Sequence, residues 1–168
     1  MISINEARDE RQIEIIEKMA ESIWNEHYTP IIGKEQVEYM LASFQNSEAI
    51  KKQINEGYRY FILYFQNEPA GYFAIQPDLK DKSMFLSKLY IRKDFRGNGL
   101  SHKCLEYIQE ICRDLGLRKI WLTVNKRNEN SIKIYKKLGF ENKKSIIQDI
   151  GNGFVMDDYL MEKKLTSD

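Results

Sequence analysis

The chain has 168 residues, of which 26 are Lys or Arg and 25 are Asp or Glu, so its formal net charge is +1. This length suits one domain, which we expect to cover residues 1–168, and the nearly neutral charge gives no electrostatic argument for a nucleic-acid partner. No apolar run has the length needed to cross a membrane and no signal-peptide pattern follows Met1, so the sequence predicts a cytoplasmic protein without a membrane partner.

The first third of the chain has the pattern of one short strand followed by helices. We expect the strand at residues 2–6, and Asp9 is the expected cap of a first helix that Thr29-Pro30 ends. Ser47 is the expected cap of the last helix in this region, and Gly57 is its expected end. Apolar residues at helical spacing mark the inner face of each helix: Ile13, Ile16, Ala20, Ile23 and Trp24, then Val37, Met40, Leu41 and Phe44, then Ile50 and Ile54.

From Tyr58 the pattern changes to strands. Residues 58–65 are aromatic or β-branched on both faces, which is typical of a central strand. Asn67-Glu68 is expected to turn the chain into a second strand at residues 69–75. A polar turn at residues 77–82 then leads to a third strand at residues 84–91.

The remaining chain is predicted to form two helices and three strands. Leu105, Ile108, Ile111, Cys112 and Leu115 define one face of the longer helix, which Gly116 ends, and a short strand follows at residues 120–124. On the second helix Ser131, Ile134, Tyr135 and Leu138 share a face, and Gly139 ends it. The last two strands cover residues 140–150 and 154–162, and Gly151-Asn152-Gly153 joins them as a hairpin turn.

The segment between the third strand and the longer helix is a basic loop that contains two glycines. The first N–H groups of a helix are unpaired and carry the positive end of its dipole, so this geometry predicts an anion site. Gly97 and Gly99 would let the backbone approach such a ligand closely. Gly99 is followed by Leu100 and not by Lys, which excludes a P-loop, and His102 takes the place of the third glycine of a dinucleotide loop. A tight turn without a ligand is the alternative that the loop alone leaves open.

Two short patterns point to one family. Arg96, Gly99 and Ser101 fit the pattern Gln/Arg-x-x-Gly-x-Gly/Ala, with Ser101 as a small replacement. Downstream, Asn128, Tyr135, Gly139 and Phe140 fit Asn-x-x-Ala-x-x-x-Tyr-x-x-x-Gly-Phe, with Ser131 in place of the alanine. Both patterns resemble the GNAT superfamily of N-acetyltransferases, the first its pyrophosphate loop.

The order of the expected elements, β-α-α-α-β-β-β-α-β-α-β-β, is also similar to the GNAT fold with extra helical residues near the start. The resemblance therefore extends from end to end. It implies an α/β fold with a central, twisted and mostly antiparallel mixed sheet flanked by helices. Two parallel strands of that sheet would splay apart, and here they would be residues 84–91 and 120–124.

The resemblance implies acetyl-CoA as cofactor. Extended pantetheine would pair with the backbone of the splayed strand, the pyrophosphate would lie on the loop, and Asn128 would hydrogen-bond the pantetheine while also capping its helix. The residues expected to contact acetyl-CoA are Leu89, Tyr90, Ile91, Arg96, Gly97, Asn98, Gly99, Leu100, Ser101, Asn128, Ser131 and Tyr135. Lys103 and Arg127 would meet the ribose phosphate, with solvated surface charges as the alternative.

Tyr135 is the expected catalytic residue. By the resemblance it would donate to the sulfur that leaves when a neutral amine attacks the thioester, and a backbone N–H near Leu89 would stabilise the oxyanion. Full proton transfer from a tyrosine to a thiolate is uphill by about 2 kcal/mol from their free pKa values, which favours a hydrogen bond. From the residues alone, a buried tyrosine on the apolar face of its helix is the alternative.

The acceptor side is expected to involve Glu26, Tyr28, Tyr58 and Tyr60, and the general base is not identified. Asp157 and Asp158 could attract a cationic amine, with a solvated edge strand as the alternative. Residues 24–57 and 153–159 are similar to the bacterial branch that includes spermidine/spermine acetyltransferases.

The predicted function is acetyl transfer from acetyl-CoA to a primary amine of a small molecule, for which a polyamine is one candidate, by direct attack in a ternary complex. A protein or peptide N-acetyltransferase and a non-catalytic CoA-binding regulatory module are the alternatives, and a monomer or a homodimer is expected. Cys104 and Cys112 would lie about 12 Å apart along one helix, too far for a disulfide. With two histidines and no His/Cys cluster, no metal site is predicted.

Overall fold

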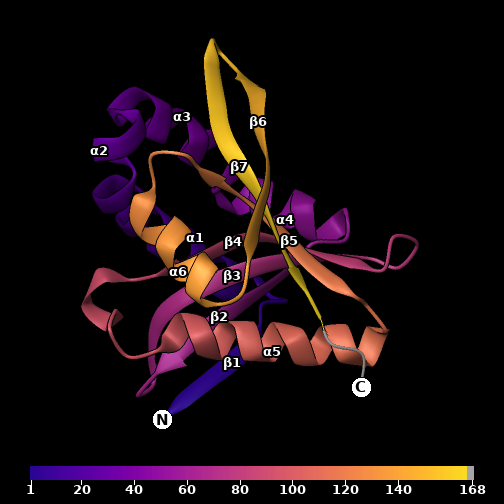
Figure 1. Cartoon of the computed structure of the whole chain (residues 1–168). Helices are drawn as coiled ribbons and strands as arrows, with labels where there is room; N and C mark the ends of the chain where they lie inside the picture. Colours follow the sequence, from indigo (N-terminus) through magenta and orange to yellow (C-terminus); the bar gives the residue numbers. More distant parts are fainter. Residues whose placement is uncertain (166–168) are drawn as a thin grey trace. The chain divides into compact units, whose positions relative to one another are not determined.

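The computed structural model describes residues 1–165 (Figure 1). Contacts between residues divide the chain into two compact units, which are described in turn. The N-terminal unit consists of Met1–Gln76 and Lys88–Tyr107, and the C-terminal unit consists of Pro77–Ser87 and Ile108–Asp168. Strand β4 and helix α5 each contribute residues to both units.

The N-terminal unit contains strands that pair in sequence order and four helices that precede β2. Strand β1 pairs antiparallel with β2, and β2 pairs antiparallel with β3. The elements are β1 (Ile2–Glu6), α1 (Glu10–His27), α2 (Thr29–Ile32), α3 (Lys34–Phe44), α4 (Ser47–Asn55), β2 (Arg59–Phe65), β3 (Glu68–Asp78), β4 (Ser83–Ile91), a 3-10 turn (Lys93–Phe95) and α5 (Leu100–Leu115).

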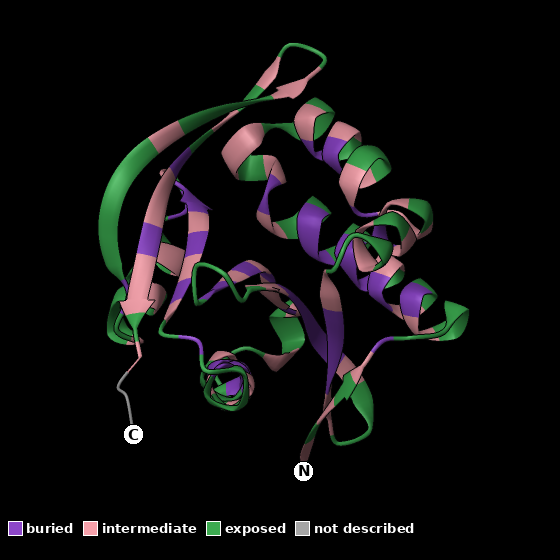
Figure 2. Cartoon of the chain, turned by 90° about the vertical axis from the view of Figure 1, so that its right-hand side faces the viewer, coloured by how far each residue is buried: buried purple, intermediate pink, exposed green. Residues whose placement is uncertain are grey.

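The core of this unit is built on the two strands whose sequences are apolar on both faces. Residues 60–63 of β2 and 70–75 of β3 are buried, and the rings of Phe61 and Phe73 stack with centroids 4.8 Å apart (Figure 2). The apolar stripe of α1, which includes Ile16 and Ile23, is buried as its spacing predicts. Asp9 caps that helix, because its carboxylate accepts a hydrogen bond from the backbone N–H of Gln12.

The C-terminal unit contains β5 (Lys119–Asn125), α6 (Glu129–Lys137), β6 (Glu141–Gly151) and β7 (Phe154–Lys164). The first residues of β4, Ser83–Phe85, pair parallel with Lys119–Trp121 of β5. Strand β7 pairs antiparallel with both β5 and β6. The order in the seven-stranded sheet is β1-β2-β3-β4-β5-β7-β6. This mixed sheet with flanking helices confirms the predicted fold class.

Several local expectations were wrong. Helix α1 does end before Thr29-Pro30, but these residues also begin the short helix α2, which was not expected and in whose first turn the missing N–H of Pro30 costs nothing. Asn46 and not Ser47 caps α4, with its Oδ1 atom 2.8 Å from the backbone nitrogen of Ala49. The turn after β2 is formed by Gln66 and Asn67, whose φ angles are 51° and 69°, and Glu68 already belongs to β3.

One further difference concerns the exposure of a side chain. Ile134 is 46% exposed and does not belong to a buried face of α6, because that helix has no buried residue. Cys104 and Cys112 are both free and buried, and burial raises the pKa of each thiol to about 12. Within residues 1–165, no helix combines the length and the apolar character that crossing a bilayer requires.

Candidate active site

The loop from β4 to α5 in the N-terminal unit is fixed at its start. The backbone N–H of Arg92 donates to the carbonyl of Ala70 at 2.8 Å, and its guanidinium donates to the carbonyl of Pro69 at 3.0 Å. The guanidinium also lies over the ring of Phe95, 5.3 Å from its centroid. The backbone N–H of Phe95 closes the short 3-10 turn on the carbonyl of Arg92. These contacts fix the backbone position from which residues 96–99 continue.

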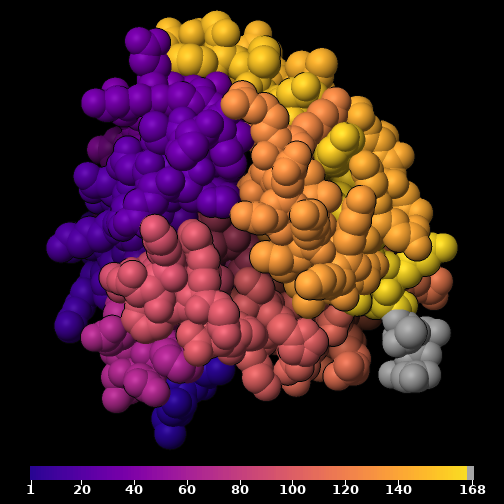
Figure 3. Space-filling view, turned by 60° about the vertical axis from the view of Figure 1, so that its left-hand side comes forward, coloured from indigo at the N-terminus to yellow at the C-terminus, as the bar shows by residue number. Residues whose placement is uncertain are grey.

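The end of the loop is open and rich in backbone donors. Residues 96–99 are exposed at the surface (Figure 3). Within the described chain, the N–H groups of residues 97–101 have no backbone acceptor, and the first such bond of α5 runs from Lys103 to Gly99. Five donors therefore lie at the start of a sixteen-residue helix, where its dipole is positive. This arrangement can bind a phosphate or pyrophosphate anion.

The two glycines of the loop are required for their backbone conformation. Gly97 and Gly99 have φ angles of 83° and 70°, which side chains rarely tolerate, although a Cβ atom at either position would meet nothing within 4 Å. Arg96 is exposed, and its Nε atom donates to the carbonyl of Ile91 at 3.1 Å. The predicted pyrophosphate-binding residues are thus brought together in one loop, and Lys103 beyond it is held by an ion pair with Glu106 at 3.6 Å.

The side chain of Tyr90 belongs to an aromatic cluster. Its ring centroid lies 5.6 Å from that of Trp24, 6.0 Å from that of Tyr28 and 5.4 Å from that of Tyr72. Gly71 on β3 was not predicted to matter. A Cβ atom there would collide with the carbonyl oxygen of Tyr90, so the glycine allows β3 to approach the strand expected to bind pantetheine. In the sequence, a glycine inside a strand pattern was the feature that could have indicated this close approach.

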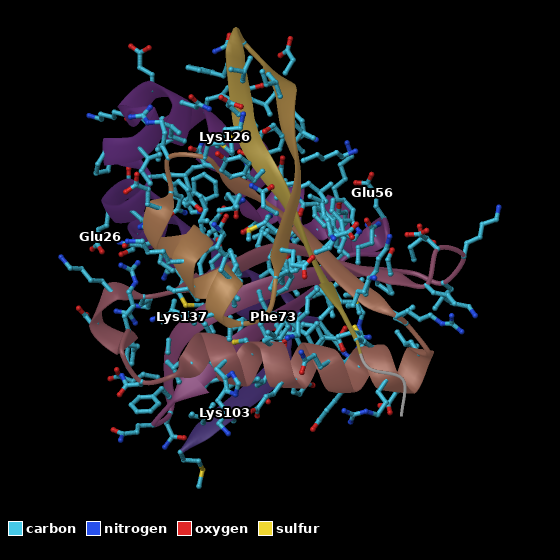
Figure 4. All side chains as sticks on the ribbon, viewed as in Figure 1. Glu26, Glu56, Phe73, Lys103, Lys126 and Lys137 are labelled. Carbon is cyan, nitrogen blue, oxygen red and sulfur yellow. The ribbon has the colours of Figure 1, made fainter. Side chains whose placement is uncertain are left out.

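The residues expected to face the acceptor have different environments. Glu26 is exposed near the end of α1 (Figure 4), whereas Tyr28 is buried in the aromatic cluster. Tyr58 is half-buried, and burial followed by the charge of Glu56 raises its pKa. Tyr60 is fully buried, and its hydroxyl donates to Gln53. The structure therefore distributes these four side chains between surface and core.

Lys88 is a buried charged residue that the sequence reasoning missed. It is 8% exposed, and its ammonium donates to the carbonyl of Phe44 at 3.3 Å, to Oε1 of Gln53 at 3.1 Å and to the hydroxyl of Tyr60. Burial lowers its pKa to about 7. In the sequence, this lysine stands between apolar positions of a strand. Such a position is typical of the exposed face of a half-buried strand, so its burial could not be predicted.

In the C-terminal unit, Asn128 is placed as expected at the start of α6. Its backbone N–H donates to the carbonyl of Asn125 at 3.0 Å, and its Oδ1 accepts from the backbone N–H of Ser131 at 3.4 Å. The side chain is 2% exposed, and its Nδ2 atom has no hydrogen-bond partner in residues 1–165. Capping and ligand binding are therefore compatible, because the cap uses the oxygen and leaves the amide donor.

Tyr135 and Ser131 lie on the same helix, one turn apart, and both are half-buried. The ring of Tyr135 meets the edge of Phe140 at 5.6 Å, and its carbonyl accepts the backbone N–H of Phe140. Gly139, with a φ angle of 99°, ends the helix between them. The spacing of Tyr135, Gly139 and Phe140 is therefore explained by the way the chain leaves the C-terminal end of α6.

The family follows from comparison with known proteins. Residues 16–140 match the sequence profile of the acetyltransferase (GNAT) family. The chain belongs to the GNAT family. This confirms the predicted family and the prediction of an N-acetyltransferase, and acetyl-CoA, the acetyl donor typical of this family, is confirmed as the cofactor.

Individual relatives of this GNAT protein are distant. An uncharacterised N-acetyltransferase of Lactobacillus delbrueckii subsp. lactis is 24% identical over 86% of the chain and 89% of its own length. The thialysine N-epsilon-acetyltransferase of Caenorhabditis elegans is 31% identical over 62% of the chain and 69% of its own length. The chain spans about half the length of the bovine and porcine thialysine enzymes that it also matches.

A solved structure agrees on the fold. The PaiA N-acetyltransferase of Thermoplasma acidophilum, crystallised with coenzyme A, superimposes with a TM-score of 0.81 over 98% of this chain and 99% of its own. Its sequence is 19% identical, so this likeness establishes the GNAT fold.

Proposed function

We propose that this GNAT protein transfers an acetyl group from acetyl-CoA to a primary amine of a small molecule, by direct attack of the amine in a ternary complex. The observation that carries the proposal is the set of five N–H groups at residues 97–101, which have no backbone acceptor at the positive end of α5. Unpaired donors occur at the start of any α-helix, but here Gly97 and Gly99 add left-handed backbone that lets the donors converge on one anion.

The residues present fit acetyl-CoA. Residues 96–101 would hold the pyrophosphate, and the backbone of residues 89–91 would pair with the amides of the pantetheine arm. Asn128 would donate its unpaired Nδ2 hydrogens to a pantetheine carbonyl, with Ser131 beside it on α6. Bound acetyl-CoA supplies the acetyl group as a thioester, which an amine can attack.

Tyr135 is the residue that we assign to the leaving group. Its hydroxyl would donate to the sulfur and stabilise the developing thiolate as the carbon–sulfur bond breaks. A backbone N–H near Leu89 would stabilise the oxyanion. Of the four expected acceptor-side residues, Glu26, Tyr28 and Tyr58 stay in the proposal, while the hydroxyl of Tyr60 is already committed to Gln53 and Lys88.

The class of acceptor is proposed as a small aliphatic amine. The related Caenorhabditis elegans enzyme acts, by its name, on the epsilon-amine of thialysine, which is a small primary amine. Polyamines belong to the same chemical class and stay candidates. We also propose that both units form one N-acetyltransferase domain, because the family profile extends over residues of each. Two buried free thiols suit the reducing cytoplasm.

A panel of amines tests the proposal. Purified protein is mixed with acetyl-CoA and polyamines, aminoglycosides, amino acids or peptides, and free CoA is measured. We expect release that depends on at least one small amine and yields its N-acetyl product. Release that is equally fast without any amine would contradict the proposal, and release with peptides alone would replace the acceptor class.

A further inference from the structure

Asp158 on β7 is buried with an unsatisfied carboxylate. Asp158 is 3% exposed, and its Oδ1 atom has no hydrogen-bond partner in residues 1–165. A buried acceptor without a donor is costly, and a buried carboxylate is more costly still. Such groups are rare unless something outside the chain satisfies them.

The cation whose charge acts on this carboxylate forms its ion pair with another residue. Lys126 forms its ion pair with the neighbouring Asp157, at 2.8 Å between Nζ and Oδ1, and its ammonium lies over the ring of Tyr159. The charge of Asp157 opposes the ionisation of Asp158, whereas a hydrogen bond from Thr123 and, to a smaller extent, the charge of Lys126 favour it. Within residues 1–165, Asp158 therefore has one neutral donor and no ion pair.

The surroundings of Asp158 follow from the strand register. Asp158 lies opposite Asn125, and Leu160 lies opposite Thr123. Paired residues of an antiparallel ladder project to the same face, and alternate residues share that face. Trp121 is therefore on the face of Asp158, and its ring stacks on Phe85 with centroids 4.1 Å apart. Phe85, Trp121 and Leu160 give this face an apolar part, and Asp158 lies at its end. Glu162, opposite Trp121, and Lys144, opposite Leu160, border it.

We propose that Asp158 binds the positively charged nitrogen of the acceptor and so selects aliphatic ammonium compounds. An alkyl chain would lie along the apolar part of this face, and the ammonium would donate to Oδ1 of Asp158. This inference rests on the proposed function, because it names a specificity residue of the same reaction. Asp158 acts by charge and hydrogen bonding and forms no covalent bond. Burial, followed by the charge of Asp157, raises the pKa of Asp158 to about 6, which leaves it ionised at neutral pH.

Asp157 provides a matched control within the chain. It has the same chemistry one residue away, but its side chain is 53% exposed and paired with Lys126. Asp157→Asn should therefore remove an equal charge from the same strand without removing the proposed contact. Asp158→Asn keeps the size of the side chain and also removes one charge.

Two ligands of equal length separate charge from shape: putrescine (1,4-diaminobutane, a dication at neutral pH) and butane-1,4-diol. Each is titrated into ¹⁵N-labelled protein saturated with CoA, while the amide shifts of Thr123, Asn125 and Asp158 are followed. We expect putrescine, and not the diol, to shift these signals. Asp158→Asn should weaken putrescine binding at least ~10-fold, the cost of one lost charged hydrogen bond, and Asp157→Asn less than ~2-fold.

The wild-type protein alone gives a second measurement that does not depend on a variant folding. Putrescine should lower the pKa of the Asp158 carboxyl, followed by its ¹³C shift, by about 1 unit or more, because a cation within about 6 Å favours the carboxylate. The inference is wrong if putrescine causes no shift in wild-type protein, if the diol binds equally well, or if both variants bind equally. A parallel CoA titration is the check on the proposed function, because CoA binding without a putrescine response overturns only the role of Asp158.

Discussion

The N-terminal unit buries a lysine and the C-terminal unit buries an aspartate, and their surroundings differ. The ammonium of Lys88 has three N–H donors and three acceptors, on Phe44, Gln53 and Tyr60. The carboxylate of Asp158 has an oxygen without a donor, although Lys126 directly follows its register partner Asn125. Equal burial therefore does not mean equal roles. A satisfied group holds elements together, whereas an unsatisfied group is available to a ligand.

The largest effect should come from removing the satisfied group. Lys88→Ala leaves a cavity and strips a donor from Phe44, Gln53 and Tyr60, so we expect unfolding free energy to fall by about 3–4 kcal/mol. The affinity for acetyl-CoA should change little in the folded variant. Denaturant unfolding and a ligand titration on one preparation measure both, and a stable variant with weak cofactor binding would reverse the assignment of Lys88 to structure.

Tyr135→Phe should produce the opposite pattern in the C-terminal unit. The ring still meets Phe140, so we expect stability to change by less than about 1 kcal/mol. Loss of the hydroxyl should lower kcat roughly 10²-fold, with little change in either KM. Steady-state kinetics with an acceptor found in the panel decide the matter. An undiminished kcat would remove Tyr135 from the mechanism.

The pH dependence of stability gives a third test, because the pKa of Lys88 lies near 7 in the folded chain and near 10.5 when it is unfolded. Between these values the unfolded chain binds a proton that the folded chain lacks, so stability should rise with pH in this window. From pH 7.5 to 9 the gain from one such proton is up to about 2 kcal/mol. Lys88→Met should lose this component, and an identical slope in both proteins would show that Lys88 does not titrate there.

A change in stability of the opposite sign is expected for the unsatisfied group. The pKa of Asp158 is raised to about 6, so its ionisation costs stability as the pH rises to 7, and Asp158→Asn removes that cost. We expect the variant to be as stable as the wild type or more stable by about 1–2 kcal/mol at pH 7. Thermal unfolding at pH 5 and pH 7 provides the comparison. A strong loss of stability at pH 7 would make Asp158 a structural residue like Lys88.

Sequence patterns predicted the features that depend on local chemistry. The order of strands and helices followed from apolar spacing, and the left-handed conformations of Gly97 and Gly99 followed from the residue type at a strand-to-helix turn. Errors arose where two neighbours could do the same task, as with Asn46 and Ser47 at the cap of α4. Both belong to the residue types that cap helices, and only the hydrogen bond to Ala49 distinguishes them.

Tertiary packing decided what the sequence could not show. Lys88 is one of many lysines, and its burial depends on acceptors from α3, α4 and β2 that are 28 to 44 residues away. Asp157 and Asp158 looked equivalent as two acidic residues on a strand, but the pleat exposes one to Lys126 and buries the other. Pairing across β5 and β7, and not composition, separates the two.

Calorimetric titration of acetyl-CoA into the wild type and into Gly99→Val tests the central claim most directly. The φ angle of 70° at Gly99 is strained for a branched residue, so the variant should displace the donors of residues 97–101 at an exposed site while the chain still unfolds cooperatively. We predict saturable binding to the wild type and at least ~10-fold weaker binding to the folded variant. Equal affinities in two folded proteins would show that the anion binds elsewhere and would contradict the account.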